Sequence, residues 1–445
     1  MSLEITKNEP VTIVGGGLAG CEAAWQLLRR GHRVRMYEMK PQKYSPAHNN
    51  EHLAELVCSN SLKSNSIDNA SGLLKEEMRR LGSLIISTAD ETSIPAGAAL
   101  AVDRGRFAAH VEARLKKQIN FSLTRLEISN IPDDTLTIIA TGPLTSDSLA
   151  QNIARLLGAQ YLFFYDAIAP IVEAHSIDMD KVFRASRYDK GTPDYLNCPL
   201  EKNQYDAIRH ELLAAQKISL KSFEEERYFE ACLPIEVLAS RGEKTLAFGP
   251  MKPVGLIDPK KGKKPYAVVQ LRPENSAGTL FNMVGFQTKL KWSEQKRVFR
   301  LIPGLEKAEF SRMGSIHRNT YIHAPLLLLP TLQLKTNRNI FFAGQITGVE
   351  GYAESAAMGL WAGLNAALAL EGKEIAPPPA CTAVGALLNY LTTPVTADSF
   401  QPMNISFGLL NNLPHKKTGK KERKVIYAQR ALQALDEWIR SCNLC

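Results

Sequence analysis

Residues 11–38, "VTIVGGGLAGCEAAWQLLRRGHRVRMYE", decide the fold of this chain. An apolar strand leads into Gly15, Gly17 and Gly20, in the spacing G-x-G-x-x-G. A helix and a second strand follow, and the second strand ends at Glu38, which would accept hydrogen bonds from a ribose. The glycines permit a tight turn and close approach of a pyrophosphate, and the helix N-terminus offers N–H groups to the anion. The stretch predicts a dinucleotide-binding βαβ unit.

Two further segments suit the same domain. Residues 136–142, "LTIIATG", form an apolar strand whose Thr-Gly end would approach the nucleotide. Residues 339–368 predict a buried strand, a glycine-rich loop and a helix of small residues, which could lay N–H groups near a flavin ring. Glycine loops at both ends of the chain favour one FAD domain built from both ends. The predicted cofactor-binding residues are Gly15, Gly16, Gly17, Leu18, Ala19, Gly20, Glu38, Gly142, Gly344, Gly348, Gly351 and Ala353.

The composition is that of a globular protein with more than one domain. A chain of 445 residues predicts two or three domains, and its 44% hydrophobic and 22% charged residues are ordinary. Its first residues have no secretory pattern and no apolar stretch is long enough to span a bilayer, so we expect a cytoplasmic protein without a membrane partner. Seven scattered cysteines without a CxxC pair, and no H-E-x-x-H pattern, predict no metal site.

The middle of the chain has a different character. Between about 160 and 330 the βαβ rhythm is lost, which predicts an inserted domain. Residues 240–300 hold thirteen Lys or Arg against four acidic residues, and a second basic run at 416–424 precedes an amphipathic helix. Two basic clusters favour a nucleic-acid partner, although a solvated lysine-rich loop explains the first one as well. The lysines in this loop and the aromatic residue beside them are Lys260, Lys261, Lys263, Lys264 and Tyr266.

Several longer blocks carry a more specific signal. They keep their order along nearly the whole chain and include "AELVCSNSLKS" at 54–64, "FEACLPIEVLASRG" at 229–242 and "FFAGQITGVEGYAESAAMG" at 341–359. In these blocks the chain resembles the folate- and FAD-dependent tRNA uracil-5-methyltransferases, the TrmFO family, which is related to the GidA or MnmG flavoproteins.

The resemblance implies a reaction and its cofactors. A one-carbon unit would pass from 5,10-methylenetetrahydrofolate through reduced FAD to C5 of uridine 54 in the tRNA T loop, and NADPH or NADH would restore the flavin. C5 of uracil is a poor nucleophile until a thiolate adds to C6. Cys232 resembles the family cysteine proposed to attack C6, and Cys58 resembles the one thought to lie beside the flavin. Both are predicted to be catalytic, and the division of roles between them stays open.

The cysteines by themselves allow a second interpretation. Without the family, the residues around Cys58 and Cys232 favour small buried thiols, because a reactive thiol needs access and polar or positive surroundings. Cys21 follows the glycine loop on a packing helix and is predicted to be structural. His48 and His317 could meet a cofactor or only the backbone.

The sequence therefore predicts an α/β protein: a Rossmann-like FAD-binding domain with a mixed α+β insertion domain. Its predicted parts are 1–165 (FAD-binding), 166–330 (basic and RNA-facing) and 331–445 (FAD-binding, with a C-terminal helical segment). Three alternatives stay open: the same chemistry on ribosomal RNA, a small-molecule flavin oxidoreductase, and an RNA-binding protein that keeps FAD structurally. The sequence does not determine the oligomeric state, and a monomer is compatible with it.

Overall fold

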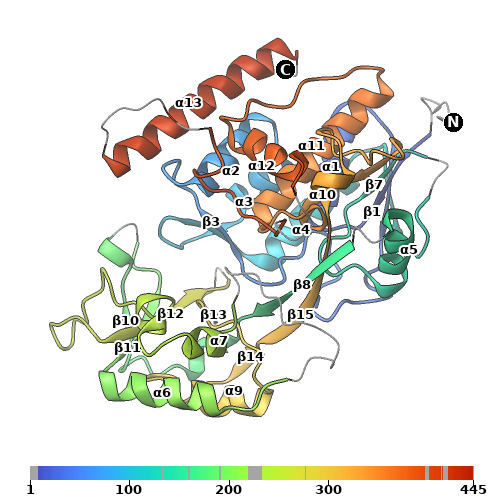
Figure 1. Ribbon diagram of the computed structural model, residues 1–445. Coiled ribbons are helices and arrows are strands. Elements are labelled where there is room, and N and C mark those ends of the chain that lie inside the picture. Colours follow the sequence, from blue (N-terminus) through green and yellow to red (C-terminus); the bar gives the residue numbers. More distant parts are fainter. Residues whose placement is uncertain are drawn as a thin grey trace.

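The two ends of the chain meet in one parallel sheet of the computed structural model (Figure 1). Its strands pair in parallel throughout, so their carboxyl ends lie at one edge. In spatial order they are β16 (Ile340–Phe342), β7 (Thr137–Ile139), β1 (Val11–Val14), β2 (Val34–Glu38) and β6 (Phe121–Arg125). The structure describes residues 9–132, 135–158, 161–189, 192–218, 233–275, 277–395, 400–411, 413 and 419–443.

Helices α1 and α11 pack against each other at very short range. A Cβ on Gly359 would lie 2.2 Å from the carbonyl oxygen of Ala19, and one on Gly363 would lie 2.5 Å from that of Ala23. Small residues in the C-terminal block therefore let the two helices approach, which ties the ends of the chain together. The helices of this part are α1 (Leu18–Arg29), α2 (Ala70–Arg80), α3 (Leu84–Glu91), α4 (Arg104–Lys116), α5 (Asp147–Leu157), α10 (Ala324–Leu327), α11 (Tyr352–Leu370), α12 (Ala383–Thr392) and α13 (Lys420–Ser441), with the 3-10 turn η4 (Gly344–Thr347).

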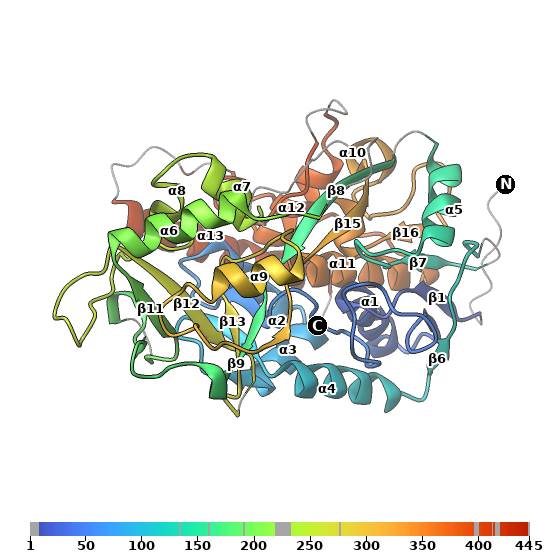
Figure 2. The same ribbon diagram turned by 90° about the horizontal axis from the view of Figure 1, so that it is seen from below.

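A second sheet, antiparallel, is built from the middle of the chain. Its strands are β10 (Phe183–Arg184), β11 (Leu196–Leu200), β12 (Ala267–Pro273), β13 (Leu280–Met283), β9 (Ile171–Glu173) and β14 (Phe310–Arg312). Figure 2 shows α6 and α9 over this sheet, and their buried residues join its strands in a separate hydrophobic core. The helices here are α6 (Lys202–Ala214), α7 (Ile235–Ser240), α8 (Thr245–Phe248) and α9 (Trp292–Phe299), with the 3-10 turns η1 (Ala174–Ser176) and η2 (Arg187–Asp189).

A long antiparallel ribbon runs between the two sheets (Figure 1). It pairs β8 (Tyr161–Ile168) with β15 (Ser315–Ile322), so the chain enters and leaves the middle part side by side. A small third sheet contains β3 (Ser61–Ser64), β5 (Ala99–Val102) and β4 (Ser93–Ile94). The loop that carries Cys58 directly precedes β3 and faces the antiparallel sheet.

The predicted fold class is confirmed, since a parallel α/β part and a mixed α and β part are both present. The second core draws on residues from Val172 to Ala308, whereas Tyr321 and Leu328 already belong to the core of the parallel part. The boundaries at 165 and 330 stay predictions. In the part of the chain that the structure describes, no helix is long and apolar enough to cross a membrane.

Candidate functional site

The turn between β1 and α1 contains closely packed glycines and one open position. Gly15 has φ +106°, and a Cβ on it would lie 2.6 Å from the carbonyl oxygen of Ala140. A Cβ on Gly20 would lie 1.9 Å from the carbonyl oxygen of Gly15. By contrast, a Cβ on Gly17, the N-cap of α1, would meet no atom within 4 Å. The fold therefore requires glycine at positions 15 and 20. Gly17 instead leaves open the space where a pyrophosphate would meet the helix N-terminus.

Glu38 closes this turn from the end of β2. Its Oε2 accepts a 2.8 Å hydrogen bond from the N–H of Gly16, and its Oε1 accepts one of 2.9 Å from the N–H of Lys40. The side chain is buried. Each carboxylate oxygen has a further lone pair, so Glu38 can still accept a hydrogen bond from a ribose hydroxyl.

A cavity of about 80 Å³ lies in front of the turn. Its lining includes Gly15, Gly16, Gly17, Glu38, His48 and Thr141. Burial lowers the pKa of His48 below its usual value, and its Nδ1 lies 2.5 Å from the hydroxyl oxygen of Ser45. The imidazole is therefore neutral at pH 7 and offers a hydrogen-bonding edge rather than a charge.

A larger cavity of about 230 Å³ follows on from the first, and Leu144 lines both. Its walls include Cys58, Arg272, Gly351, Tyr352 and Ala353. Because Tyr352 begins α11, the positive end of that helix faces the cavity, where it would stabilise negative charge on a flavin pyrimidine ring. The two neighbouring cavities, one at the nucleotide turn and one at this helix, fit the two ends of an FAD molecule.

The remaining predicted cofactor residues serve packing or stand between the two cavities. Leu18 and Ala19, both in α1, are buried in the hydrophobic core of the parallel part. A Cβ on Gly344 would lie 2.6 Å from the Cβ of Ala19, and one on Gly348 would lie 2.5 Å from the ring of Phe400. Gly142 has φ +67° and open space around it, between the cavity residues Thr141 and Pro143. The structure thus brings Gly15–Gly17, Glu38, Cys58, Gly351 and Ala353 to the cavities.

The Cys58 thiol lies in the wall of the larger cavity and is half-buried. The hydroxyl oxygen of Tyr352 accepts hydrogen bonds from the N–H groups of Cys58 (2.7 Å) and Ser59 (3.1 Å). Burial, with the Cys58 charge adding to it, raises the pKa of Tyr352 above its usual value, so the phenol stays neutral. The first residue of α11 therefore positions the loop that carries the thiol.

Three arginines of the described chain hold the same loop. Arg104 begins α4, whereas Arg272 and Arg312 extend from β12 and β14 of the antiparallel sheet. Their hydrogen bonds to the loop measure 2.7 to 3.2 Å. Arg104 donates to the carbonyl oxygens of Leu56 and Cys58. Arg312 donates to the carbonyl oxygens of Val57 and Cys58. Arg272 donates to the hydroxyl oxygen of Ser59.

The comparisons with known proteins agree with this geometry. The family model described as "Glucose inhibited division protein A" (GIDA) matches residues 10–374. The chain is 61% identical over 435 residues to the methylenetetrahydrofolate–tRNA-(uracil-5-)-methyltransferase TrmFO of Syntrophus aciditrophicus, covering 98% of each chain. It is 57% identical to the TrmFO of Desulforamulus reducens, with the same coverage. This chain belongs to the TrmFO family, within the wider GIDA family.

The fold extends to more distant GIDA proteins. Among solved structures, Aquifex aeolicus GidA in its form II crystal matches with a TM-score of 0.69 at 19% identity, over 98% of this chain and 74% of that chain. The form I crystal gives 0.67 at 18% identity, over 96% and 78%. This chain therefore has the GidA fold.

The other cysteines of this TrmFO-family chain differ in their surroundings. Cys232 and its neighbour Glu230 lie outside the described residues, as do parts of the basic run at 416–424, so the predicted role of Cys232 stays a prediction. Cys21 is fully buried and its thiol points at the carbonyl oxygen of Gly16, at 3.4 Å. Burial raises the pKa of Cys21, which suits an inert structural thiol.

Sequence reasoning did not identify the residues that hold the thiol loop. Tyr352 stands directly after the glycine loop, and a polar aromatic residue at the start of a helix is a signal that could have been used. Arg104, Arg272 and Arg312 carry no such signal, because they are far apart in sequence and meet only in the fold. The candidate site is therefore richer in positive charge than its motifs indicate.

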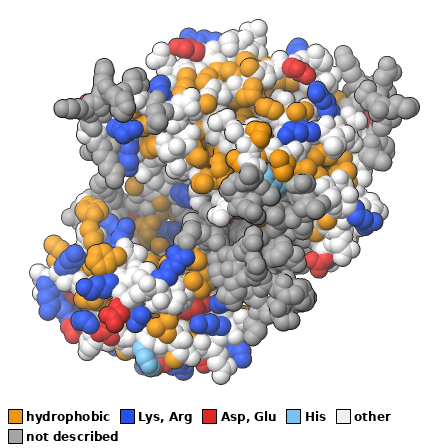
Figure 3. Space-filling view, in the orientation of Figure 1, with side chains coloured by type: hydrophobic (Ala, Val, Ile, Leu, Met, Phe, Trp, Pro, Cys, Tyr) orange, Lys and Arg blue, Asp and Glu red, His pale blue; other side chains and the backbone are white. Residues whose placement is uncertain are grey.

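The lysine-rich loop of the middle part is only partly available to a ligand. Lys261 pairs with Glu201 at 2.6 Å, and Lys260 donates to the carbonyl oxygen of Asp180. Tyr266 packs edge-on against Tyr205 instead of standing open beside the loop. Lys263 and Lys264 are exposed. Figure 3 shows Lys and Arg side chains interspersed with acidic ones over this part of the molecule.

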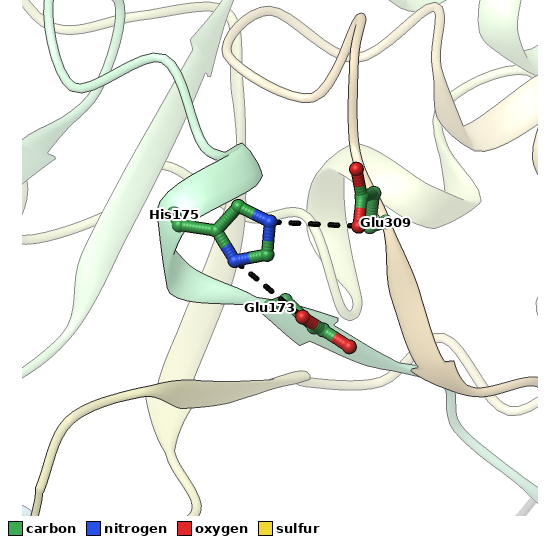
Figure 4. A group of neighbouring side chains, drawn as sticks. All are labelled: Glu173, His175 and Glu309. Carbon is green, nitrogen blue, oxygen red and sulfur yellow. Dashed lines mark ion pairs between the residues drawn. The ribbon is translucent and has the colours of Figure 1, made fainter.

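A surface cluster of metal-binding residue types has the geometry of an ion-pair group. Nδ1 of His175 faces Glu173 and Nε2 faces Glu309, each at 3.4 Å (Figure 4). The imidazole thus stands between the carboxylates, and its two nitrogens point in different directions. A metal ion needs lone pairs that converge on one point, so this arrangement favours paired charges over a metal centre.

The burial of Lys75 predicts that the stability of the folded protein depends on pH. The side chain is buried, and its Nζ donates to the carbonyl oxygens of Ser71 and of Leu62, a residue that lines the larger cavity, both at 2.8 Å. Burial lowers its pKa from 10.5 to about 7. Between these values the unfolded chain binds a proton that the folded chain lacks, so the free energy of unfolding should rise with pH, by up to about 1.4 kcal/mol per unit. Lys75→Met should flatten this rise in urea titrations from pH 7 to 10, and an unchanged slope would contradict it.

Proposed function

We propose that this chain methylates C5 of uridine 54 in the T loop of tRNA. The one-carbon unit comes from 5,10-methylenetetrahydrofolate, and the reaction uses FAD with NADPH or NADH as reductant. The observation that carries the proposal is the position of Cys58, in the wall of the cavity that the N-terminus of α11 faces. Near full-length relatives named methylenetetrahydrofolate–tRNA-(uracil-5-)-methyltransferase support the same assignment.

The chain's own groups divide between binding and chemistry. Gly17 and the N-terminus of α1 would hold the pyrophosphate of FAD, and Glu38 would hold a ribose hydroxyl. Gly351 and the N-terminus of α11 would face the flavin ring. FAD supplies the electron pair and carries the one-carbon unit when it is bound. The walls of the two cavities would keep this unit away from water.

The two thiols are proposed to act on the uracil ring. A thiolate adds to C6 of uracil, and the electron pair of the C5–C6 bond moves toward C5 and O4, which makes C5 nucleophilic. After C5 has bonded to the one-carbon unit, C5 loses its proton and the bond between the unit and its carrier breaks. A hydride equivalent, which reduced FAD would supply, takes the unit from the methylene to the methyl level as the sulfur leaves C6, which restores the double bond. We assign the attack on C6 to Cys232 and a place beside the flavin to Cys58.

The partners follow from the same proposal. Residues 1–165 and 331–445 would form the FAD-binding part, and residues 166–330 would face the RNA. The exposed Lys263 and Lys264 are available for its phosphates. Uridine 54 lies inside a folded RNA corner, so it would have to leave its stack to reach the cavity. We place the protein in the cytoplasm.

Transfer of labelled carbon tests the function. The FAD-loaded protein is incubated with labelled methylenetetrahydrofolate, NADPH and unmodified tRNA or ribosomal RNA transcripts, and nucleoside analysis locates the label. We expect labelled 5-methyluridine at position 54 of tRNA. Label in ribosomal RNA alone would overturn the substrate. No label in either RNA, with continued oxidation of NADPH, would favour a small-molecule oxidoreductase.

A further inference from the structure

We propose that Arg104, Arg272 and Arg312, here called the arginine cluster, hold the Cys58 side chain as a thiolate. The cluster approaches the thiol loop from two sides, with Arg104 on α4 and the other two on the antiparallel sheet. Its members are positioning residues, since they bind the loop rather than a reacting atom. The inference rests on the proposed function only for the use made of the thiolate.

The charges around the loop do not balance. Among the described residues, Glu274 is the carboxylate in contact with the cluster: Oε2 accepts a 2.7 Å hydrogen bond from Nε of Arg104, and Oε1 lies 3.8 Å from Nη2 of Arg272. Arg272 and Glu274 are both buried. The cavity wall beside Cys58 also holds Lys63 and two carboxylates, Glu350 and Glu354, and Glu354 pairs with Lys63 at 3.2 Å. Three guanidinium groups and one ammonium thus stand against three carboxylates, and this net positive charge favours an anion at the thiol.

The surroundings of Arg312 reflect this excess of positive charge. Its two Nη atoms bind the carbonyl oxygens of Val57 and Cys58, while its Nε is buried without a hydrogen-bond partner in the described structure. Burial and the neighbouring Arg104 lower its pKa, whereas negative charge on Cys58 raises it. Because such an interaction is mutual, Arg312 stabilises the thiolate to the same extent.

The cluster also links the two parts of the molecule. Two of its three charges come from β12 and β14, which belong to the part proposed to face the RNA. The ionisation of Cys58 therefore depends on how the antiparallel sheet sits against the thiol loop. A shift of that sheet would change the reactivity of a thiol that it does not itself carry.

The test is a pH titration of the thiolate in the FAD-loaded, full-length protein. Ultraviolet absorbance of the thiolate is taken as the difference between the wild type and Cys58→Ser, so no reagent has to enter the cavity. We expect the wild-type midpoint at least about one pH unit below the usual value for cysteine, which is about 8.5. Arg312→Met should raise it by at least about one unit, which means a tenfold loss of thiolate at pH values well below both midpoints.

Two variants separate charge from packing. Arg312→Lys keeps a positive charge and should restore part of the shift, while Arg106→Met, two residues beyond Arg104 on the exposed side of α4, should change nothing. A wild-type midpoint at or above the usual value would overturn the proposal, as would equal midpoints for Arg312→Met and Arg106→Met. The titration uses neither RNA nor folate, so a failure of methyl transfer would leave its result unaffected.

Discussion

Cys58→Ala is expected to lower carbon transfer to tRNA by at least about a hundredfold, the lower end of what one group acting in the chemical step contributes. The thiol lies in the cavity wall, whereas the proposed nucleotide contacts are at the other cavity. FAD content and oxidation of NADPH should therefore change little. Single-turnover transfer of label into unmodified tRNA measures the first quantity, and flavin and NADPH absorbance measure the others.

Cys442→Ser is the matched control for this loss. Cys442 is also outside any disulfide and half-buried, but it lies at the C-cap of α13, away from both cavities. It should transfer carbon at the wild-type rate. Cys232→Ala, assayed in parallel, tests the other proposed thiol. Undiminished transfer by Cys58→Ala would remove this residue from the catalytic site, even if the arginine cluster keeps it ionised.

Gly17→Ala should weaken FAD binding by at least about a hundredfold and leave the fold intact. The new Cβ meets no protein atom within 4 Å, and φ of −75° is ordinary for alanine. It would instead occupy the approach of the pyrophosphate to the N–H groups of α1. Loss of about 3 kcal/mol in charge-assisted hydrogen bonds corresponds to about a hundredfold in Kd. Fluorescence titration of the apoprotein with FAD measures it.

Gly20→Ala, three residues further along, should fail in a different way. Its Cβ would lie 1.9 Å from the carbonyl oxygen of Gly15, so the turn itself must move and the fold should lose at least about 3 kcal/mol. Gly105→Ala serves as the neutral control. Gly105 lies in α4, and a Cβ on it would lie 3.7 Å from Oδ1 of Asp103, which is an ordinary contact distance. Urea unfolding of the three variants separates the effects. Equal destabilisation by Gly17→Ala and Gly20→Ala would contradict the assignment of Gly17 to the pyrophosphate.

Local patterns in the sequence were sufficient for the α/β core. The strand, glycine turn, helix and second strand at 11–38 occur as predicted, because each step depends on the residues within it. The small-residue helix at 352–370 was likewise predictable, since a run of glycines and alanines indicates a helix that packs closely against its neighbour. Glu38 and Cys58 could be proposed as site residues for the same reason.

Other assignments needed contacts between distant residues. Gly344 and Gly348 stand in the predicted cofactor loop, but the structure packs them against Ala19 and Phe400. A glycine motif does not distinguish close approach to a ligand from close approach to the protein. Tyr266, expected beside a phosphate-binding loop, packs edge-on against Tyr205, a contact that the sequence did not indicate.

The sequence by itself determined the glycine turn between β1 and α1 and the cysteine in a polar loop, because those features reside in contiguous residues. Only the tertiary structure decided the environment of that cysteine. Arg104, Arg272 and Arg312 converge on its loop from a helix and two strands of a separate sheet, and Glu274 offsets only part of their charge. Electrostatic effects depend on distance in space, and the sequence orders residues only along the chain.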